Sequence, residues 1–223
     1  MIALVFDCSS SMSIALIKNN TILQEKFFEH QAKHSELLIL EINKILIQHG
    51  YDFKDLDLVL VTNGPGSYTG LRVSLSALKM LKIGLKISCL TINSCAVIAQ
   101  KYINQHPHIK VAIQGNVGEI YFAEYQRKNN TVQELIRPLI TDVDEVYKNL
   151  KNDDFLCGSA NNLFTNHSLK SNSLDLILAR DIWILGEKNL NYVGVNQINF
   201  NEDILFDQIA PLYLRDPKIS VRK

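Results

Sequence analysis

The 223-residue chain lacks an excess of charge of either sign, because 23 lysine and arginine residues balance 23 aspartate and glutamate residues. A neutral chain has no overall field that would draw it toward nucleic acid or an anionic membrane, so a strong independent nucleic-acid binder is disfavoured. An apolar content of 47% is ample for a buried core. The length suits one large domain or two domains of about a hundred residues each.

Cysteine is also scarce, and its four copies form no C-x-x-C pair. Most of them stand in apolar contexts, where a free cysteine behaves as a small hydrophobe, so a reducing compartment is expected. The first six residues are apolar, but they have no basic flank and meet Asp7 too early for a signal peptide or a membrane span. We expect a cytoplasmic protein with no membrane association.

The familiar catalytic and metal-binding fingerprints are missing. No G-x-S-x-G or H-E-x-x-H pattern occurs, and no base can be assigned to the loop serines Ser9, Ser10, Ser11 and Ser67. His30 and His34 are four residues apart, but His30 falls at the end of an expected strand, which breaks the geometry of a helical ligand pair. We therefore expect solvated or capping histidines, no metal site and no catalytic nucleophile.

The most informative feature that is present is a glycine-rich loop between an apolar strand and a helix. It reads Asn-Gly-Pro-Gly-Ser-Tyr-Thr-Gly-Leu-Arg over residues 63–72. Glycines 64, 66 and 70 allow a close backbone approach, and Arg72 in the first helical turn adds positive charge, so an anion could bind there. The spacing matches neither G-x-G-x-x-G nor a P-loop. The alternative is a tight strand-to-helix connection without a ligand.

The periodicity predicts the same order of elements, β-β-β-α-β-α, in two successive halves. The first has strands near 2–7, 12–17, 20–28 and 58–63 and helices near 34–49 and 70–86, closed by a strand at 87–90 and a helix at 94–105. The second has strands near 110–115, 119–126, 131–137 and 154–157, helices near 141–150 and 173–190, and a short helical turn at 159–165. We predict an α/β protein with mixed sheets flanked by helices, in two packed subdomains over residues 1–106 and 107–223.

This order, the acid Asp7 after the first strand and the glycine loop together resemble the TsaB family of bacterial tRNA threonylcarbamoyladenosine biosynthesis proteins. The resemblance includes His-Ser-Glu-Leu at 34–37, Gly-Glu-Ile-Tyr at 118–121 and Pro-Leu-Tyr-Leu-Arg at 211–215. It implies the RNase H-like fold of the actin, sugar-kinase and Hsp70 superfamily.

The resemblance also implies a non-catalytic scaffold subunit. In family terms it pairs with the catalytic subunit TsaD for threonylcarbamoylation of the adenosine 3′ of the anticodon. TsaC makes the donor, threonylcarbamoyl-adenylate, and the ATPase TsaE joins the assembly. The resemblance implies that tRNA is contacted only through this complex. A pair of histidines holds the metal of TsaD, and the matching region here, residues 90–97, contains no histidine. No catalytic residue is therefore assigned to this chain.

The superfamily places an acid near nucleotide phosphates, so Asp7, Gly64 and Gly66 are the candidates for a residual nucleotide site. The alternative is that Asp7 organises the turn of serines 9–11 through local hydrogen bonds. Gln-Gly-Asn at 114–116 replaces the Asp-Ala-Arg usual in relatives, which removes an acid and a guanidinium from the second half. We expect no cofactor beyond weak ATP or ADP at the partner interface.

Two helices carry more apolar residues than one buried face requires. The surplus positions are Leu37, Leu40 and Ile47 on the first helix and Val73, Ala77, Met80 and Gly84 on the second. We expect them to form an interface with TsaD or with a second copy, and a charge at Ala77 to abolish pairing without unfolding the chain. The alternative is that other elements of the same chain cover them.

Two other functions stay open. One is a small-molecule kinase or ATP-binding enzyme of the same superfamily that uses Asp7 and the glycine loop, which calorimetry with ATP and magnesium would reveal. The other is a homodimeric interaction protein unrelated to tRNA, in which case depletion would leave the modified adenosine in place.

Overall fold

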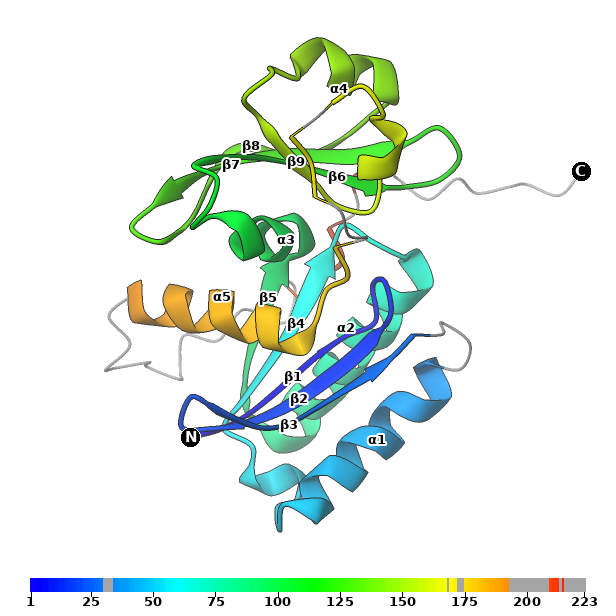
Figure 1. The fold of residues 1–223 in the computed structure, drawn as a ribbon. Coiled ribbons are helices and arrows are strands. Elements are labelled where there is room, and N and C mark those ends of the chain that lie inside the picture. Colours follow the sequence, from blue (N-terminus) through cyan, green and yellow to red (C-terminus); the bar gives the residue numbers. More distant parts are fainter. Residues whose placement is uncertain (30–33, 168, 172–174, 193–208, 213, 215–223) are drawn as a thin grey trace, which may run out of the picture.

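Three antiparallel strands and two parallel ones form the first sheet, in the order β3-β2-β1-β4-β5 (Figure 1). The computed structural model describes residues 1–29, 34–167, 169–171, 175–192, 209–212 and 214. The elements of the first half are β1 (Ile2–Asp7), β2 (Met12–Lys18), β3 (Thr21–Phe28), α1 (His34–Gln48), the 3-10 turn η1 (Phe53–Asp55), β4 (Leu58–Gly64), α2 (Tyr68–Leu85), β5 (Ser88–Asn93) and α3 (Ser94–Tyr102). Strand β1 pairs antiparallel with β2 and parallel with β4, which makes the sheet mixed.

The second sheet repeats this arrangement with the strand order β8-β7-β6-β9. Its elements are β6 (His108–Gln114), β7 (Ile120–Lys128), β8 (Thr131–Thr141), α4 (Val143–Asn149), β9 (Phe155–Cys157), the 3-10 turn η2 (Asn161–Leu163) and α5 (Ala179–Tyr192). As in the first sheet, the leading strand pairs antiparallel with the next strand and parallel with the strand that follows the helix. The predicted β-β-β-α-β-α duplication is confirmed.

The inner strands β1, β4 and β6 are buried on both faces, which explains their nearly continuous apolar runs. In β1, Leu4 and Phe6 point to the cluster shared with α1 and α2, whereas Ala3 and Val5 point to the opposite side. That opposite side faces α3 and α5, which fill the space between the two sheets. Helix α4 and η2 cover the outer face of the second sheet. Helices and sheets therefore alternate in five layers.

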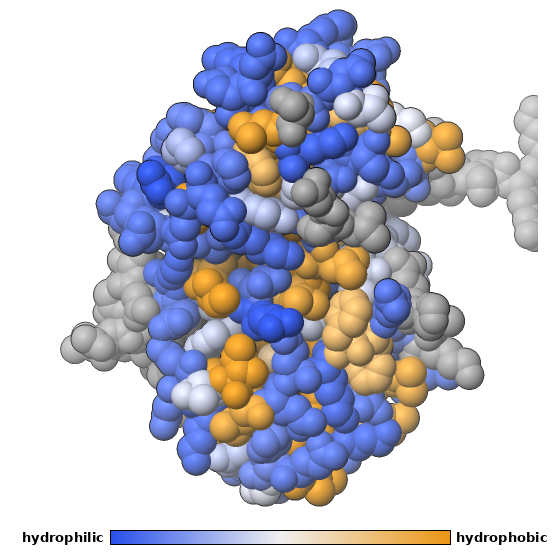
Figure 2. All heavy atoms as spheres, viewed as in Figure 1, coloured by the Kyte–Doolittle hydropathy of each residue, from blue (hydrophilic) through white to orange (hydrophobic). Residues whose placement is uncertain are grey.

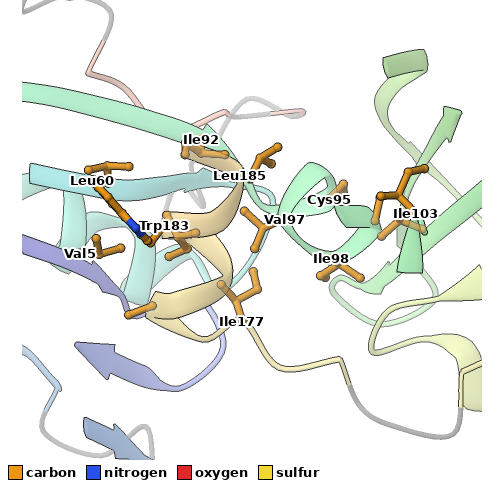
Figure 3. Close-up of a cluster of buried hydrophobic side chains, with 14 of the residues drawn as sticks. Val5, Leu60, Ile92, Cys95, Val97, Ile98, Ile103, Ile177, Trp183 and Leu185 are labelled. Atoms are coloured by element: carbon orange, nitrogen blue, oxygen red, sulfur yellow. The ribbon is translucent and has the colours of Figure 1, made fainter. Parts of the chain in front are cut away.

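Helix α5 crosses back from the second half and lies on the first sheet. Its Trp183 and Leu185 pack in the same cluster as Val5 and Leu60 (Figure 3). A Cβ at Gly186 would overlap the side chain of Leu60, so glycine permits the close approach of this helix to β4. The predicted helix near 173–190 is thus confirmed with a later start, and the sheet on which it packs was not foreseen. The boundary at residues 106 and 107 stays a prediction.

All four cysteines are free and buried, in agreement with their expected role as small hydrophobes. Burial raises the pKa of the Cys8 thiol to about 12, so it stays protonated at neutral pH. Among the described helices, none is both long enough and apolar enough to cross a bilayer.

Candidate functional site

The glycine loop is closed by the protein's own chain. A Cβ at Gly66 would lie 2.8 Å from the Cβ of Ser9, and one at Gly70 would overlap the carbonyl oxygen of Cys8. The backbone N–H of Ser67 donates to the carbonyl oxygen of Ser9 over 2.8 Å. The glycines therefore serve a close approach between this loop and the turn after β1. This geometry matches the alternative of a tight strand-to-helix connection.

The loop also starts helix α2. Ser67 is the N-cap residue, and its hydroxyl accepts a hydrogen bond from the backbone N–H of Gly70 over 3.3 Å. Gly64, at the end of β4, has a φ of +105°, a conformation that favours glycine. The cap and the two glycine contacts fix where the first turn of α2 lies.

Asp7 is completely buried, and hydrogen bonds from its own chain occupy both oxygens of its carboxylate. The hydroxyl of Thr62 donates to Oδ1. The backbone N–H and the hydroxyl of Ser9 each donate to Oδ2 over 2.9 Å. Burial raises the pKa of Asp7 to about 6, although the hydrogen bonds from Thr62 and Ser9 oppose that shift. Asp7 thus binds Ser9 of the serine turn (Ser9, Ser10 and Ser11), which is the kind of local contact that the alternative describes. A nucleotide site at Asp7, Gly64 and Gly66 stays a prediction.

A segment close to the C-terminus covers the end of β4. The backbone N–H of Leu212 donates to the carbonyl oxygen of Asn63 over 2.7 Å. Ile209 is buried in the same cluster as the inner sides of α1 and α2. Of the quoted motif at 211–215, Tyr213 and Arg215 lie outside the described residues. The serine turn, the glycine loop and residues 209–212 thus meet beside the ends of β1 and β4.

The corresponding edge of the second sheet ends in an exposed hairpin. The backbone N–H of Gly115 donates to the carbonyl oxygen of Glu119 over 2.9 Å, which closes the turn. The backbone N–H of Gln114 donates to the hydroxyl of Ser159 over 3.0 Å. Gln114 and Asn116 are exposed, so the residues that replace the usual Asp-Ala-Arg form a plain turn.

The described histidines have separate surroundings. His34 is buried at the start of α1, and the His106 ring stacks on Phe155 with a centroid distance of 3.9 Å. His30, the other member of the sequence pair, lies outside the described residues. Across the described chain, no three His, Cys, Asp or Glu side chains gather in a way that could hold a metal ion.

The outer sides of α1 and α2 expose large apolar side chains. Leu40 and Ile47 of α1 are 55% and 65% exposed, and Met80 and Ile83 of α2 are 51% and 65% exposed. We call these four residues the α1–α2 face. Figure 2 shows apolar residues gathered over the half built on the first sheet, whereas the surface around α4 is mainly hydrophilic. Single exposed apolar residues are common, but several on adjacent helices indicate an interaction surface.

The structure separates the seven predicted interface residues into three groups. Leu40, Met80 and Ile47 are exposed, as is Gly84, whereas Leu37 and Val73 are half-buried. Ala77 is only 8% exposed and packs in the core cluster of α1 and α2. The expectation that a charge at Ala77 would leave the fold intact is therefore wrong, because the charge would disturb this packing. Ile83 was missed, although its position three residues after Met80 places it on the same helix face.

A groove of about 430 Å³ runs between α1 and α2. Its apolar lining is Leu38, Ile39, Val73 and Ala77, and its polar lining is Ser35, Tyr68, Thr69, Arg72 and Ser76. The guanidinium of Arg72 lies over the ring of Tyr68, 4.0 Å from its centroid. One wall of this α1–α2 groove is therefore the first half of α2, which the glycine loop positions.

Comparison with known proteins gives the relationships of the chain. A sequence model of the family described as "TsaD: tRNA N6-adenosine threonylcarbamoyltransferase" matches residues 21–221. The chain is 29% identical over 212 residues to the "tRNA threonylcarbamoyladenosine biosynthesis protein TsaB" of Buchnera aphidicola from Acyrthosiphon pisum, covering 87% of this chain and 92% of that protein. It is 30% identical over 155 residues to the TsaB of Buchnera aphidicola from Schizaphis graminum, covering 66% of this chain and 72% of that protein.

A solved structure shares the fold. The Pseudomonas aeruginosa protein described as similar to peptidase YeaZ superposes with a TM-score of 0.81 at 20% identity, covering 96% of this chain and 99% of that one. The predicted α/β fold is thereby confirmed. With the family match over residues 21–221 and the similarity to the two Buchnera proteins, the chain belongs to the TsaB family.

Proposed function

We propose that this protein is a non-catalytic subunit of tRNA N6-threonylcarbamoyladenosine synthesis that pairs with the transferase TsaD through α1 and α2. Family membership supports the pathway, because the relatives are named as biosynthesis proteins of this modified nucleoside. The free, buried cysteines support a place in the reducing cytoplasm.

The single observation that carries the pairing is the exposed α1–α2 face. Burying the four residues of the α1–α2 face against a partner would remove apolar surface from water, which drives protein association. The α1–α2 groove beside them offers a concave apolar floor with a polar rim, which suits an anchoring side chain of the partner. The proposed partner contacts thus lie on the first half alone.

The contacts at the carboxyl ends of β1 and β4 support the proposed non-catalytic role. Asp7 is held by Thr62 and Ser9, and Gly66 and Gly70 press against the serine turn. The segment Leu90–Val97, which matches the histidine-bearing region of TsaD, contains no histidine and forms the end of β5 and the start of α3. The contribution to the reaction would be a coupling energy, in which contacts favour the competent state of TsaD. TsaE and tRNA would then be reached through that complex.

A charge on the α1–α2 face tests the pairing. We expect Met80→Glu to weaken the binding of TsaD by roughly a hundredfold or more, because the carboxylate would have to be buried without a partner. The variant should fold normally, since Met80 is exposed. Titration of TsaD in a calorimeter gives the affinity, and the modified adenosine content of tRNA from cells that depend on the variant gives the function.

Leu135→Glu is the matched control, because Leu135 is 49% exposed on β8 of the second sheet. It should bind TsaD like the wild type. Undiminished affinity of Met80→Glu would overturn the proposed interface. The self-association alternative would be favoured by two results together. The wild type would form a stable homodimer that does not bind TsaD, and depletion of the protein would leave the tRNA modification unchanged.

A further inference from the structure

We infer that Asp7 is a positioning residue that holds the first turn of α2 in place for partner binding. This inference rests on the proposed pairing through α1 and α2. It assigns a task to the acid that the fold places at the carboxyl end of its first strand. The task follows from a continuous path of contacts between Asp7 and the wall of the α1–α2 groove.

The path begins at the carboxylate, which joins two neighbouring strands to the serine turn. Oδ1 accepts from the hydroxyl of Thr62 on β4, and Oδ2 accepts from the N–H and hydroxyl of Ser9. All three residues are buried. Loss of one member of such a group leaves a buried donor or acceptor without its partner, which makes the group act as a unit.

The path continues from the serine turn to α2. The carbonyl oxygen of Ser9 accepts from the N–H of Ser67, the N-cap residue of the helix. Gly66 and Gly70 lie against Ser9 and Cys8 so closely that neither has room for a side chain. A shift of the serine turn would therefore move the loop and the first turn of the helix with it.

The path ends in the groove. Tyr68, Thr69 and Arg72 belong to the first turns of α2 and line the α1–α2 groove. A partner side chain that docks there needs these residues in one arrangement, and a wall that is fixed beforehand lowers the entropy lost on binding. The carboxylate thus acts at a distance, without touching the partner.

The test separates local loosening from general destabilisation. Thr62→Val removes one hydrogen bond to Asp7 at nearly constant shape, and Thr62→Ser keeps the hydroxyl. Asp57→Ala is the control, because Asp57 Oδ2 accepts from the N–H of Ile2 over 2.6 Å beside the other end of β4. Amide hydrogen exchange, read by mass spectrometry, is compared for residues 66–73 and for α5, together with the affinity for TsaD.

In the Thr62→Val variant we expect the amide hydrogens of residues 66–73 to exchange at least about tenfold faster, with the exchange of α5 unchanged. We expect this variant to bind TsaD about tenfold more weakly than the wild type. Thr62→Ser should restore both values, and Asp57→Ala should change neither. Equal acceleration over the whole chain, or local acceleration with unchanged affinity, would overturn the inference. Failure of the wild type to bind TsaD would instead refute the proposed function, and the exchange comparison would still judge the path from Asp7 to α2.

Discussion

The two halves of the molecule have the same order of elements but different outer layers. Helices α1 and α2 on the outer face of the first sheet span 15 and 18 residues, whereas α4 and η2 on the outer face of the second sheet span 7 and 3 residues. The long helices expose the four apolar residues of the α1–α2 face, whereas α4 has exposed charged residues such as Asp144 and Lys148. The comparison teaches that two halves with one order of elements can differ in their outer layers, and the proposed assembly surface lies on the half with the longer helices.

The halves share one structural device, a tight junction after the strand that pairs parallel with the first strand of each half, which is β4 in the first and β9 in the second. In the first half, Gly70 presses against the backbone of Cys8. In the second, Gly158, with a φ of +104°, leaves no room for a Cβ beside the carbonyl oxygen of Ala112. The backbone N–H of Ala160 donates to that same oxygen over 3.0 Å. In each half, a glycine thus packs closely against a carbonyl oxygen of the first strand or of the residue that follows it.

The largest effect is expected where that junction is broken. Gly70→Ala would drive a methyl group into the carbonyl group of Cys8, and we expect a loss of more than about 3 kcal/mol in the free energy of unfolding. Gly84→Ala in the same helix has open space around it and should gain roughly 0.5 to 1 kcal/mol. Urea unfolding of both variants gives the values. Equal stabilities would show that the junction is looser than the structure indicates.

A buried charge group in the second half is expected to be nearly as sensitive. Lys110 Nζ lies 2.8 Å from Glu124 and 3.1 Å from Asp154, and donates to the carbonyl oxygen of Asn149 over 2.6 Å. Lys110→Met leaves the buried Asp154 and the half-buried Glu124 without their cation, so we expect a loss of about 3 kcal/mol in urea unfolding. Lys148→Met is the control, since its solvent-exposed pair with Glu145 should contribute little to stability. A loss below about 1 kcal/mol for Lys110→Met would contradict the burial of this group.

Asp7 in the first half offers a pH-dependent contrast. Its folded pKa of about 6 exceeds the ordinary value of 3.8, so the folded state binds this proton more tightly than the unfolded state. The stability from this group is complete below the ordinary pKa and is lost as pH rises through about 6. Cys8, with a pKa of about 12, stays neutral throughout this window.

The free energy of unfolding of the wild type should therefore fall, relative to that of Asp7→Asn, by about 3 kcal/mol between about pH 4 and about pH 7. The measurement is urea unfolding of both proteins at several pH values, because the subtraction removes the titration of groups that the two share. A difference independent of pH would mean that Asp7 is less buried than the structure shows.

Local sequence patterns were enough to place nearly every element. The apolar run before the glycine loop predicts β4, and Ser67 followed by leucines at helical spacing predicts α2, because caps and periodicity act over a few residues. The docking of α5 on the first sheet was not predictable, since an apolar helix face does not specify which sheet it covers. Gly186 marks a close approach, but only the structure shows that Leu60 is what it approaches.

The site was predicted less completely, for a related reason. Exposure of Leu40, Ile47 and Met80 follows from their place outside the main stripe of each helix. Burial of Ala77 follows from the packing of α1 beside α2, which the pattern of one helix cannot report. The position of Asp7 in the sequence is compatible with a nucleotide-binding acid or with an acid that binds the serine turn. Only the structure shows that its carboxylate oxygens accept hydrogen bonds from Thr62 and Ser9.

The most direct test of the central claim compares amide hydrogen exchange of the two outer layers with and without TsaD. We predict that TsaD slows exchange in the peptides of α1 (His34–Gln48) and α2 (Tyr68–Leu85) and leaves α4 (Val143–Asn149) unchanged. Protection of α4 or β8 with none in α1 and α2 would contradict the assignment of the pairing surface to the first half.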